Sequence, residues 1–384
     1  MTAIVTDAHY RMSVSLIRDL FDRGVRVAAC EKASIEAPVG FASRGAAQCV
    51  RLPDEEYEAA LLALCREVLE IEGEKPVLLP VGAKTLAMVS RSRDAFSAVA
   101  GLCAATPSQL TLFNDKAAVS ALAKTLGVPV PESFERQPEE ADEPFFSRVP
   151  LPCAVKPHCG ESFGLTASQR YRICRTKNEL IAAFRHFQTL TNEDPIVQEY
   201  LPGAAYGCSV LAKDGAVYRS LCHRRVREYP VSGGPSSCCE SVSRSDLLAF
   251  SEALVQETGF TGPAMFEFKC AADGSPRLLE VNPRVWGTFP LTRAAKTDFA
   301  YSWFCLAANL PLPEEVPAQH VKMAYYPADF AAGLGYLKAG QPGRFFAAAA
   351  DFLSPCVKNG IADPKDPAPA QVYFRNLFHR GGHK

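Results

Sequence analysis

Apolar positions in the first hundred residues follow two alternating spacings. Short, nearly continuous apolar runs are typical of strands buried on both faces, and three occur here, at residues 3–6, 25–30 and 77–81. Between them, residues 13–23 and 57–70 carry apolar side chains three or four positions apart, as amphipathic helices do. This strand–helix–strand order predicts an α/β domain with a parallel sheet over about residues 1–105.

The spacing changes from residue 106 onward. Residues 107–126 have helical spacing and stop at residues 127–131, which are rich in Gly and Pro. Residues 135–150 are acidic and proline-rich, which predicts a surface loop. Strand patterns dominate from residue 153 and are interrupted by two helical stretches, residues 179–188 and 245–258. We therefore expect a second, α+β domain over residues 106–310.

The last part of the chain, residues 311–384, is rich in Pro and Ala. It includes the run Asp363-Pro364-Lys365-Asp366-Pro367, which favours irregular structure. We expect a C-terminal extension that packs on the body of the protein, with the run at residues 363–367 as an irregular tail.

One Asp-Gly pair joins two short apolar runs, residues 264–270 and 276–282. Asp-Gly in this setting is a strong signal for a hairpin with a two-residue turn. With that turn, Ala272 pairs with Ser275, and Glu267 lies directly opposite Glu280. Asn282 is two residues beyond Glu280 and shares its face of the strand.

Two carboxylates and an amide oxygen on one face suit a hard divalent cation. Mg²⁺ is the first candidate, because it usually keeps substrate phosphates in its remaining positions. The alternative is a surface hairpin in which both glutamates are solvated. The opposite face of the hairpin argues against that alternative, because it carries four apolar side chains that imply burial: Phe266, Phe268, Leu279 and Val281.

The composition narrows the class of protein. A chain of 384 residues is long enough for two or three domains. With 41 basic and 42 acidic residues, the net charge of -1 gives no support for nucleic acid or an anionic membrane as the main partner. No apolar stretch is long enough to span a bilayer, and the N-terminus lacks the basic segment of a signal peptide, so we expect a cytoplasmic protein.

Cysteine and glycine motifs argue against two further classes. The 14 cysteines are scattered through apolar runs without a C-x-x-C motif, so we expect reduced thiols and no zinc site. The turn after the first strand, residues 6–10, lacks G-x-G-x-x-G. A dinucleotide-dependent oxidoreductase therefore loses its main sequence support.

Two segments have the chemistry of a nucleotide site. Lys156 ends a predicted strand, from where it can reach a phosphate, and the loop after it carries Gly160, Ser162 and Gly164. Glycines let backbone N–H groups approach phosphate oxygens closely, although such a segment is often only a turn. Residues 196–203 predict a strand that runs into a linker. The polar groups there could face the edge of an adenine, and the alternative is an ordinary strand end.

Taken in order, five segments resemble the ATP-grasp superfamily of carboxylate–amine ligases over about residues 1–310. They are Asn114-Asp115-Lys116, Val155-Lys156-Pro157, Gln198-Glu199-Tyr200-Leu201, Phe266-Glu267-Phe268 and Glu280-Val281-Asn282-Pro283-Arg284. Residues 223–234 and 281–287 are similar to a branch related to the carbamoyl-phosphate-synthase-like ligases. The resemblance implies an ATP-grasp fold, in which two subdomains within residues 106–310 sandwich ATP, behind an N-terminal parallel-sheet domain.

The resemblance also implies roles for the matching residues. ATP phosphates would be held by Lys116 and Lys156 and covered by the loop with Gly160, Ser162 and Gly164. The adenine pocket would be lined by Gln198, Glu199, Tyr200 and Leu201. One or two Mg²⁺ ions, with Mn²⁺ as an alternative, would be bound by Glu267, Glu280 and Asn282. Arg284 would steady the transferred phosphoryl group or the acyl phosphate. The family often has a ribose-binding glutamate shortly after the position of Gly203, and its absence from Ala204-Ala205-Tyr206 predicts weaker nucleotide binding.

Three arginines within four residues form a second group of interest. On a regular strand, Arg225 and Arg227 share one face and Arg224 the other. A guanidinium on the inner face would bind a carboxylate through two hydrogen bonds. Our hypothesis is that Arg225 or Arg227 binds the substrate carboxylate, and the alternative is a solvated basic strand.

These observations favour an ATP-dependent ligase that joins a small carboxylic acid, with an amino acid as one candidate, to an amine. One alternative is a kinase or carboxylase that stops at an acyl or carboxy phosphate. Another, favoured by the missing ribose glutamate, is a nucleotide-binding module with weakened catalysis. The sequence identifies neither substrate, predicts no nucleic acid or membrane partner, and leaves the oligomeric state open, with a homodimer as one arrangement.

Overall fold

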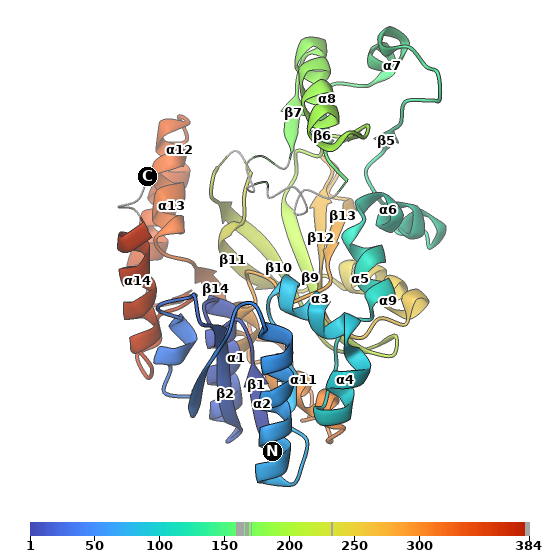
Figure 1. The fold of residues 1–384 in the computed structure, drawn as a ribbon. Coiled ribbons are helices and arrows are strands. Elements are labelled where there is room, and N and C mark those ends of the chain that lie inside the picture. Colours follow the sequence, from blue (N-terminus) through green and yellow to red (C-terminus); the bar gives the residue numbers. More distant parts are fainter. Residues whose placement is uncertain (159–164, 166–168, 170, 232, 381–384) are drawn as a thin grey trace.

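The structure is a computed structural model, and it describes residues 1–158, 165, 169, 171–231 and 233–380. The described residues form three sheets (Figure 1). The N-terminal sheet lies at the bottom of the view, a small sheet lies at the top, and the largest sheet lies between them.

The N-terminal sheet is parallel, as the sequence predicts. Its strand order is β3 (Gln48–Leu52), β2 (Arg26–Lys32), β1 (Thr2–Val5) and β4 (Val77–Leu79). Side chains alternate between the two faces of β1, so Ala3 and Val5 pack toward one helical layer and Ile4 toward the other. The first layer is α1 (Arg11–Asp22) with α11 (Phe299–Ala308), and the second is α2 (Tyr57–Glu72), α3 (Ala83–Arg91) and α4 (Arg93–Val99).

The small sheet consists of four antiparallel strands in the order β5 (Ser133–Phe134), β8 (Ile196–Glu199), β6 (Cys153–Lys156) and β7 (Arg172–Cys174). It packs on α7 (Asp142–Arg148) and α8 (Lys177–Thr191). The helix α7 corrects the prediction that residues 135–150 form a surface loop. Phe145 and Phe146 within this acidic stretch are buried against Phe184 of α8, and that burial stabilises the helix.

The largest sheet has seven strands, antiparallel except for its last pair. Their order is β13 (Pro276–Asn282), β12 (Gly262–Cys270), β9 (Ala205–Lys213), β10 (Ala216–Glu228), β11 (Ser236–Val242), β14 (Lys322–Ala324) and β15 (Val357–Asn359). One face of β12 and β9 packs on α5 (Pro107–Asn114), α6 (Lys116–Thr125) and α9 (Ser245–Thr258). The other face of these strands carries polar residues that line a cavity.

Helices make up much of the C-terminal part, although the sequence interpretation had assigned none there. They are α12 (Ala328–Lys338), α13 (Pro342–Leu353) and α14 (Ala368–Arg380), at the left of Figure 1. Alanine is the strongest helix former, so an Ala-rich stretch favours helix wherever proline does not interrupt it. The run at residues 363–367 lies in neither a helix nor a strand, as predicted, and Asp366 ties it to the body by accepting from Arg18 Nε (2.9 Å) and Ser43 Oγ (2.7 Å).

The β12–β13 hairpin places Glu267 opposite Glu280, as predicted, but through a different turn. Its loop has three residues rather than two, because the Ala271 N–H donates to the Ser275 carbonyl (2.9 Å) and Gly274 adopts a φ of 83°. A register shift between Glu267 and Phe268 then offsets the extra loop residue. The offset changes which leucine is buried. Leu278, and not the predicted Leu279, packs with Phe266, Phe268 and Val281.

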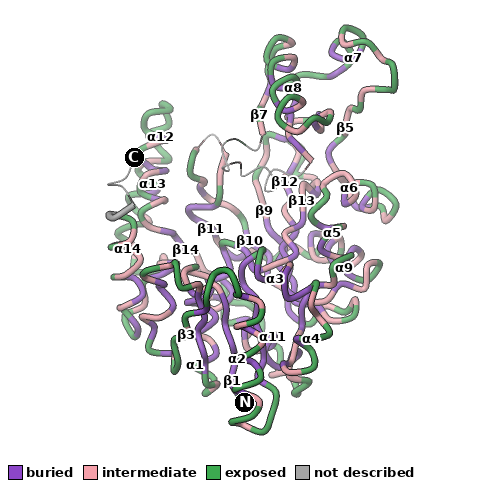
Figure 2. Tube along the Cα trace, in the orientation of Figure 1, coloured by how far each residue is buried: buried purple, intermediate pink, exposed green. Residues whose placement is uncertain are grey.

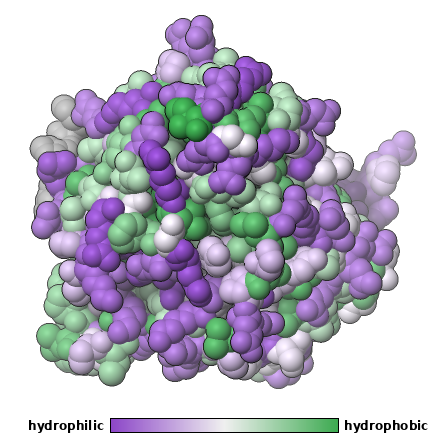
Figure 3. Space-filling view, turned by 90° about the horizontal axis from the view of Figure 1, so that it is seen from below, coloured by the Kyte–Doolittle hydropathy of each residue, from purple (hydrophilic) through white to green (hydrophobic). Residues whose placement is uncertain are grey.

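Burial follows the sheets and the helix faces that cover them, whereas the outer helix faces are exposed (Figure 2). Seen from below, hydrophilic and hydrophobic residues are interspersed over the surface (Figure 3). No helix among the described residues is long and apolar enough to cross a membrane.

Candidate active site

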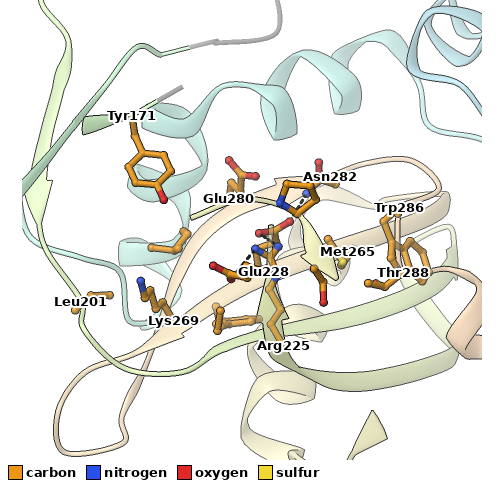
Figure 4. A pocket seen from close by; sticks show the side chains of 18 of the residues that line it. Tyr171, Leu201, Arg225, Glu228, Met265, Lys269, Glu280, Asn282, Trp286 and Thr288 are labelled. Atoms are coloured by element: carbon orange, nitrogen blue, oxygen red, sulfur yellow. Dashed lines mark hydrogen bonds and ion pairs between the residues drawn. The ribbon is translucent and has the colours of Figure 1, made fainter. Parts of the chain in front are cut away.

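A cavity of about 410 Å³ lies between the small sheet, which contains β6 and β8, and the seven-stranded sheet (Figure 4). Most of the residues singled out from the sequence line it, although they come from α6, β6, β8, β10, β12, β13 and the segments that follow β8 and β13. They are Lys116, Lys156, Gln198, Glu199, Tyr200, Leu201, Arg225, Glu267, Glu280, Asn282 and Arg284. Arg227 does not line this cavity, and Gly160, Ser162 and Gly164 lie outside the described residues.

The three oxygen-bearing residues of the hairpin form the floor of the cavity. The Asn282 side-chain N–H donates to Glu267 Oε1 (3.1 Å), and Glu267 Oε2 pairs with the Arg225 guanidinium. Lys116 Nζ lies 3.1 Å from Glu280 Oε2. The Glu267 side chain is only 15% exposed, so the alternative of a solvated surface hairpin does not describe this pair.

The two glutamates differ in their electrostatic surroundings. Burial raises the pKa of Glu267, and the attraction of Arg225 offsets this only in part. Burial also acts to raise the pKa of Glu280, but the nearby Lys116 and Lys156 cations overcome it and lower the pKa to about 2. Glu280 is therefore held as a carboxylate at neutral pH.

This donor set fits Mg²⁺ only together with ligands from outside the protein. Among the described residues, no group of three or more His, Cys, Asp or Glu side chains could hold a metal ion by itself. Two carboxylates and one amide oxygen leave several of the six positions around Mg²⁺ unfilled. Water and phosphate oxygens are its usual ligands in such positions, so the site suits a metal that arrives with a phosphorylated ligand.

The two lysines reach the cavity from different elements. Lys116 is the first residue of α6, where Asp115 caps the helix by accepting hydrogen bonds from the backbone N–H groups of Ala117 (2.9 Å) and Ala118 (3.0 Å). This cap also divides the helical region predicted at residues 107–126 into α5 and α6. Lys156 ends β6, and burial together with repulsion by Lys116 lowers its pKa to about 8.

The end of β8 and the linker after it form a further wall of the cavity. The Gln198 side chain is buried and donates to Ser133 Oγ (3.2 Å), whereas Glu199 Oε2 accepts from the backbone N–H of Glu132 (3.3 Å). Leu201 is buried in the linker. This wall is thus apolar at Leu201 and polar at the strand end, a combination that suits the face and edge of a flat heterocycle.

A bulge in β10 overturns the prediction that Arg225 and Arg227 share a face. Arg225 pairs with Cys239 of β11, but Arg227 pairs with Cys238, the next residue along that strand. Successive strand residues point to opposite faces, so the bulge at Val226 sends Arg227 to the far side. There it donates to Asp329 and Asp351.

The structure also leaves little capacity in Arg225 for a substrate carboxylate. Its guanidinium pairs with Glu267 and lies 3.5 Å from Glu228 Oε1. It therefore neutralises the acidic floor of the cavity. The hypothesis that Arg225 or Arg227 binds the substrate is weakened for both residues by these internal pairs.

Sequence reasoning missed several residues of the cavity wall, among them Arg11, Tyr171, Glu228 and Lys269. Lys269 is two residues beyond Glu267 on β12, so strand alternation could have placed it on the same face. Nothing in the local sequence pointed to Arg11, which comes from the N-terminal domain. The histidine in this wall, His223, is buried and bonds Thr288 Oγ1 (3.2 Å), and its burial lowers its pKa to about 3.

Comparison with known proteins agrees with this architecture. Residues 191–326 match a family model described as ATP-grasp in the biosynthetic pathway with Ter operon. No curated protein matches the chain.

Several solved structures share the fold at low sequence identity. The Campylobacter jejuni biotin carboxylase β-γ-ATP complex has a TM-score of 0.65 at 14% identity, covering 84% of this chain and 74% of the other. The L-amino acid ligase from Bacillus licheniformis has a TM-score of 0.58 at 16% identity, covering 84% and 78%. The ADP complex of PurK, an N5-carboxyaminoimidazole ribonucleotide synthetase, has a TM-score of 0.62 at 14% identity, covering 88% and 84%. The chain therefore has the fold of these ATP-grasp proteins, and residues 191–326 match an ATP-grasp family model.

Proposed function

We propose that the protein is an ATP-dependent ligase that activates a small carboxylic acid as an acyl phosphate and joins it to an amine. ADP and phosphate are the other products. The observation that carries this proposal is a cavity in which three lysines, three arginines and the Glu267, Glu280 and Asn282 side chains converge. An L-amino acid ligase with the same fold makes an amino acid a natural first choice of substrate.

In this proposal the nucleotide enters between the two sheets. Gln198, Glu199, Tyr200 and Leu201 contact the adenine, and Lys116 and Lys156 contact the phosphates. Glu267, Glu280 and Asn282 hold one or two Mg²⁺ ions, or Mn²⁺ in their place. The metal supplies positive charge against the phosphate oxygens.

The protein contributes mainly position and charge. A carboxylate is a poor acyl donor because its leaving group would be oxide, and transfer of the γ-phosphoryl group to it creates a better one. Lys116 and Lys156 offset the negative charge of the transferring group, while Arg284 steadies the acyl phosphate. The amine then attacks the acyl carbon and phosphate leaves, so no nucleophilic side chain is required.

A screen of ADP release tests the proposal. The purified protein is incubated with MgATP and pairs of acids and amines, beginning with the twenty L-amino acids in both roles. We expect ADP release to require one acid and one amine together, and mass spectrometry to find the amide. Release that depends on the acid alone would support the kinase or carboxylase alternative instead. Tight MgADP binding without turnover on any pair would support a weakened nucleotide-binding module.

The low pKa of Lys156 predicts how nucleotide binding depends on pH. Its ammonium faces Lys116 from α6 and Glu280 from β13, and its pKa of about 8 lies below the usual value of 10.5. The cation is therefore present below pH 8 and is lost as the pH rises through 8. We expect the affinity for MgADP to fall by up to about tenfold per pH unit above 8, as measured by calorimetric titration between pH 7 and 9.5.

The Lys156→Arg variant is the matched control for this profile. Arginine keeps its charge throughout the range, so its MgADP affinity should be nearly flat between pH 7 and 9.5. If the variant showed the same fall as the wild type, Lys156 would not be the titrating group.

A further inference from the structure

Arg11 enters the cavity from the N-terminal domain, at the first position of α1. Its Nε and Nη2 atoms both donate to the Gly287 carbonyl, at 3.3 and 3.0 Å. The guanidinium carbon lies 4.1 Å from the centre of the Tyr325 ring. The hydrogen bonds and the stacking together hold the position of a long side chain that would otherwise be mobile.

The charge of Arg11 is not neutralised within the described part of the chain. No carboxylate there lies within ion-pair distance of it, and its known hydrogen bonds are to one backbone oxygen. Arg225 and Arg227, by contrast, each pair with two carboxylates. Arg11 is therefore a positioned guanidinium in the cavity wall with donor capacity left for a ligand.

The C-terminal part of the chain supports this arrangement. Tyr325 directly follows β14 and is buried. A Cβ at Gly360, just after β15, would overlap the Tyr325 ring, so only glycine leaves room for the ring beneath Arg11. Segments from both ends of the chain thus combine to build this corner of the cavity.

The corner lies at the opposite end of the cavity from the proposed adenine wall. Figure 4 shows Trp286 and Thr288 on one side of Glu280 and Asn282, and Leu201 and Lys269 on the other. Arg11 bonds Gly287, which lies between Trp286 and Thr288 in the sequence. The buried His223, which bonds Thr288 beside this corner, is neutral at physiological pH and adds no charge there.

We propose that Arg11 binds a second carboxylate, distinct from the one that is phosphorylated, so that one of the two substrates carries an additional free carboxylate. The inference rests on the proposed function, because it assigns the far end of the same cavity to the acid and amine. A planar guanidinium with donor capacity left favours a carboxylate over a neutral group. The second carboxylate belongs either to the amine, as in an α-amino acid acceptor, or to the acid, as in a dicarboxylate.

Steady-state kinetics on the responding pair test the proposal. The variants are Arg11→Gln, Arg11→Lys and, as a matched control, Arg26→Gln, which removes an exposed arginine from the same domain. We expect Arg11→Gln to raise one substrate's KM about 10- to 100-fold, with the KM for ATP and kcat within about threefold of wild type. The KM of Arg11→Lys should lie between those of the wild type and Arg11→Gln, and the kinetic constants of Arg26→Gln should match those of the wild type.

A substrate analogue separates binding from a structural effect. For the wild type, the KM of that substrate should rise by a similar factor when its second carboxylate is replaced by the amide. For Arg11→Gln, the KM values of the acid and the amide should be about equal. A rise in the amine's KM assigns the carboxylate to the acceptor, and a rise in the acid's KM assigns it to the donor. If the variant still distinguishes acid from amide as the wild type does, the proposal is wrong.

Direct binding tests the inference even if no pair releases ADP. Wild type and Arg11→Gln, each saturated with magnesium and a non-hydrolysable ATP analogue, are melted with and without succinate and each of the twenty L-amino acids. We expect at least one of these carboxylates to raise the melting temperature of the wild type and not of Arg11→Gln. If none stabilises the wild type, or if both proteins respond alike, the Arg11 assignment fails, whereas the absence of ADP release alone argues only against the proposed ligase.

Discussion

Replacing Glu280 with Gln is expected to reduce turnover by roughly 10³-fold or more, in the range seen when a group that stabilises the transition state is removed. Gln keeps the shape of the side chain but removes the negative charge from one of the two carboxylates proposed to bind the metal. Glu280 is also the counter-charge of Lys116, 3.1 Å away, and of the nearby Lys156. Its loss therefore affects the proposed metal site and the proposed phosphate site together.

Two measurements separate this effect from a loss of structure. We expect the Mg²⁺-dependent part of ADP affinity, measured by calorimetry, to fall at least about tenfold while the melting temperature changes little. Glu240→Gln is the matched control, because Glu240 pairs with Arg224 (2.8 Å) on the opposite face of the same sheet. The variant Glu240→Gln should keep wild-type turnover. If Glu280→Gln keeps more than a tenth of the activity, the hairpin glutamates do not form the catalytic metal site.

The second large effect concerns stability, and we expect Asp329→Ala to lower the free energy of unfolding by about 3–5 kcal/mol. Asp329 accepts two hydrogen bonds from Arg227, both at 2.8 Å, and one from Ser237 Oγ (3.0 Å). The Arg227 and Asp329 side chains are 3% and 1% exposed. Truncation would leave the guanidinium buried beside Asp351 alone, and a buried charge that loses its partner is costly.

Urea denaturation of two further variants shows whether burial is the cause. Asp246→Ala breaks an ion pair in which the side chain of Asp246 is 41% exposed, and it should cost less than about 1 kcal/mol. Replacing both members of the buried pair, as Arg227→Met with Asp329→Leu, should restore most of the stability because no charge is left unpaired. A cost for Asp329→Ala no larger than that for Asp246→Ala would contradict this explanation.

The pair between Arg227 and Asp329 also explains why part of the sequence interpretation was wrong. Regular alternation places Arg225 and Arg227 on one face, and one extra residue at Val226 separates them. A bulge depends on how a strand pairs with both neighbours, and the arginine-rich sequence carries no local sign of it. The prediction that Glu267 faces Glu280 was confirmed, because the longer loop and the register shift of the hairpin offset each other.

The sequence by itself determined three strands and two helices of the N-terminal domain, the hairpin with its facing glutamates, and the ordered segments that resemble the ATP-grasp superfamily. These features are local, since side-chain period, turn residues and short motifs act over a few positions. Only the tertiary structure decided that Arg227 is an internal ion-pair partner, that the C-terminal part is helical and extends the sheet, and that Arg11 and Tyr325 meet at the cavity. Those outcomes depend on strand pairing and on packing between residues up to hundreds of positions apart, which no local pattern encodes.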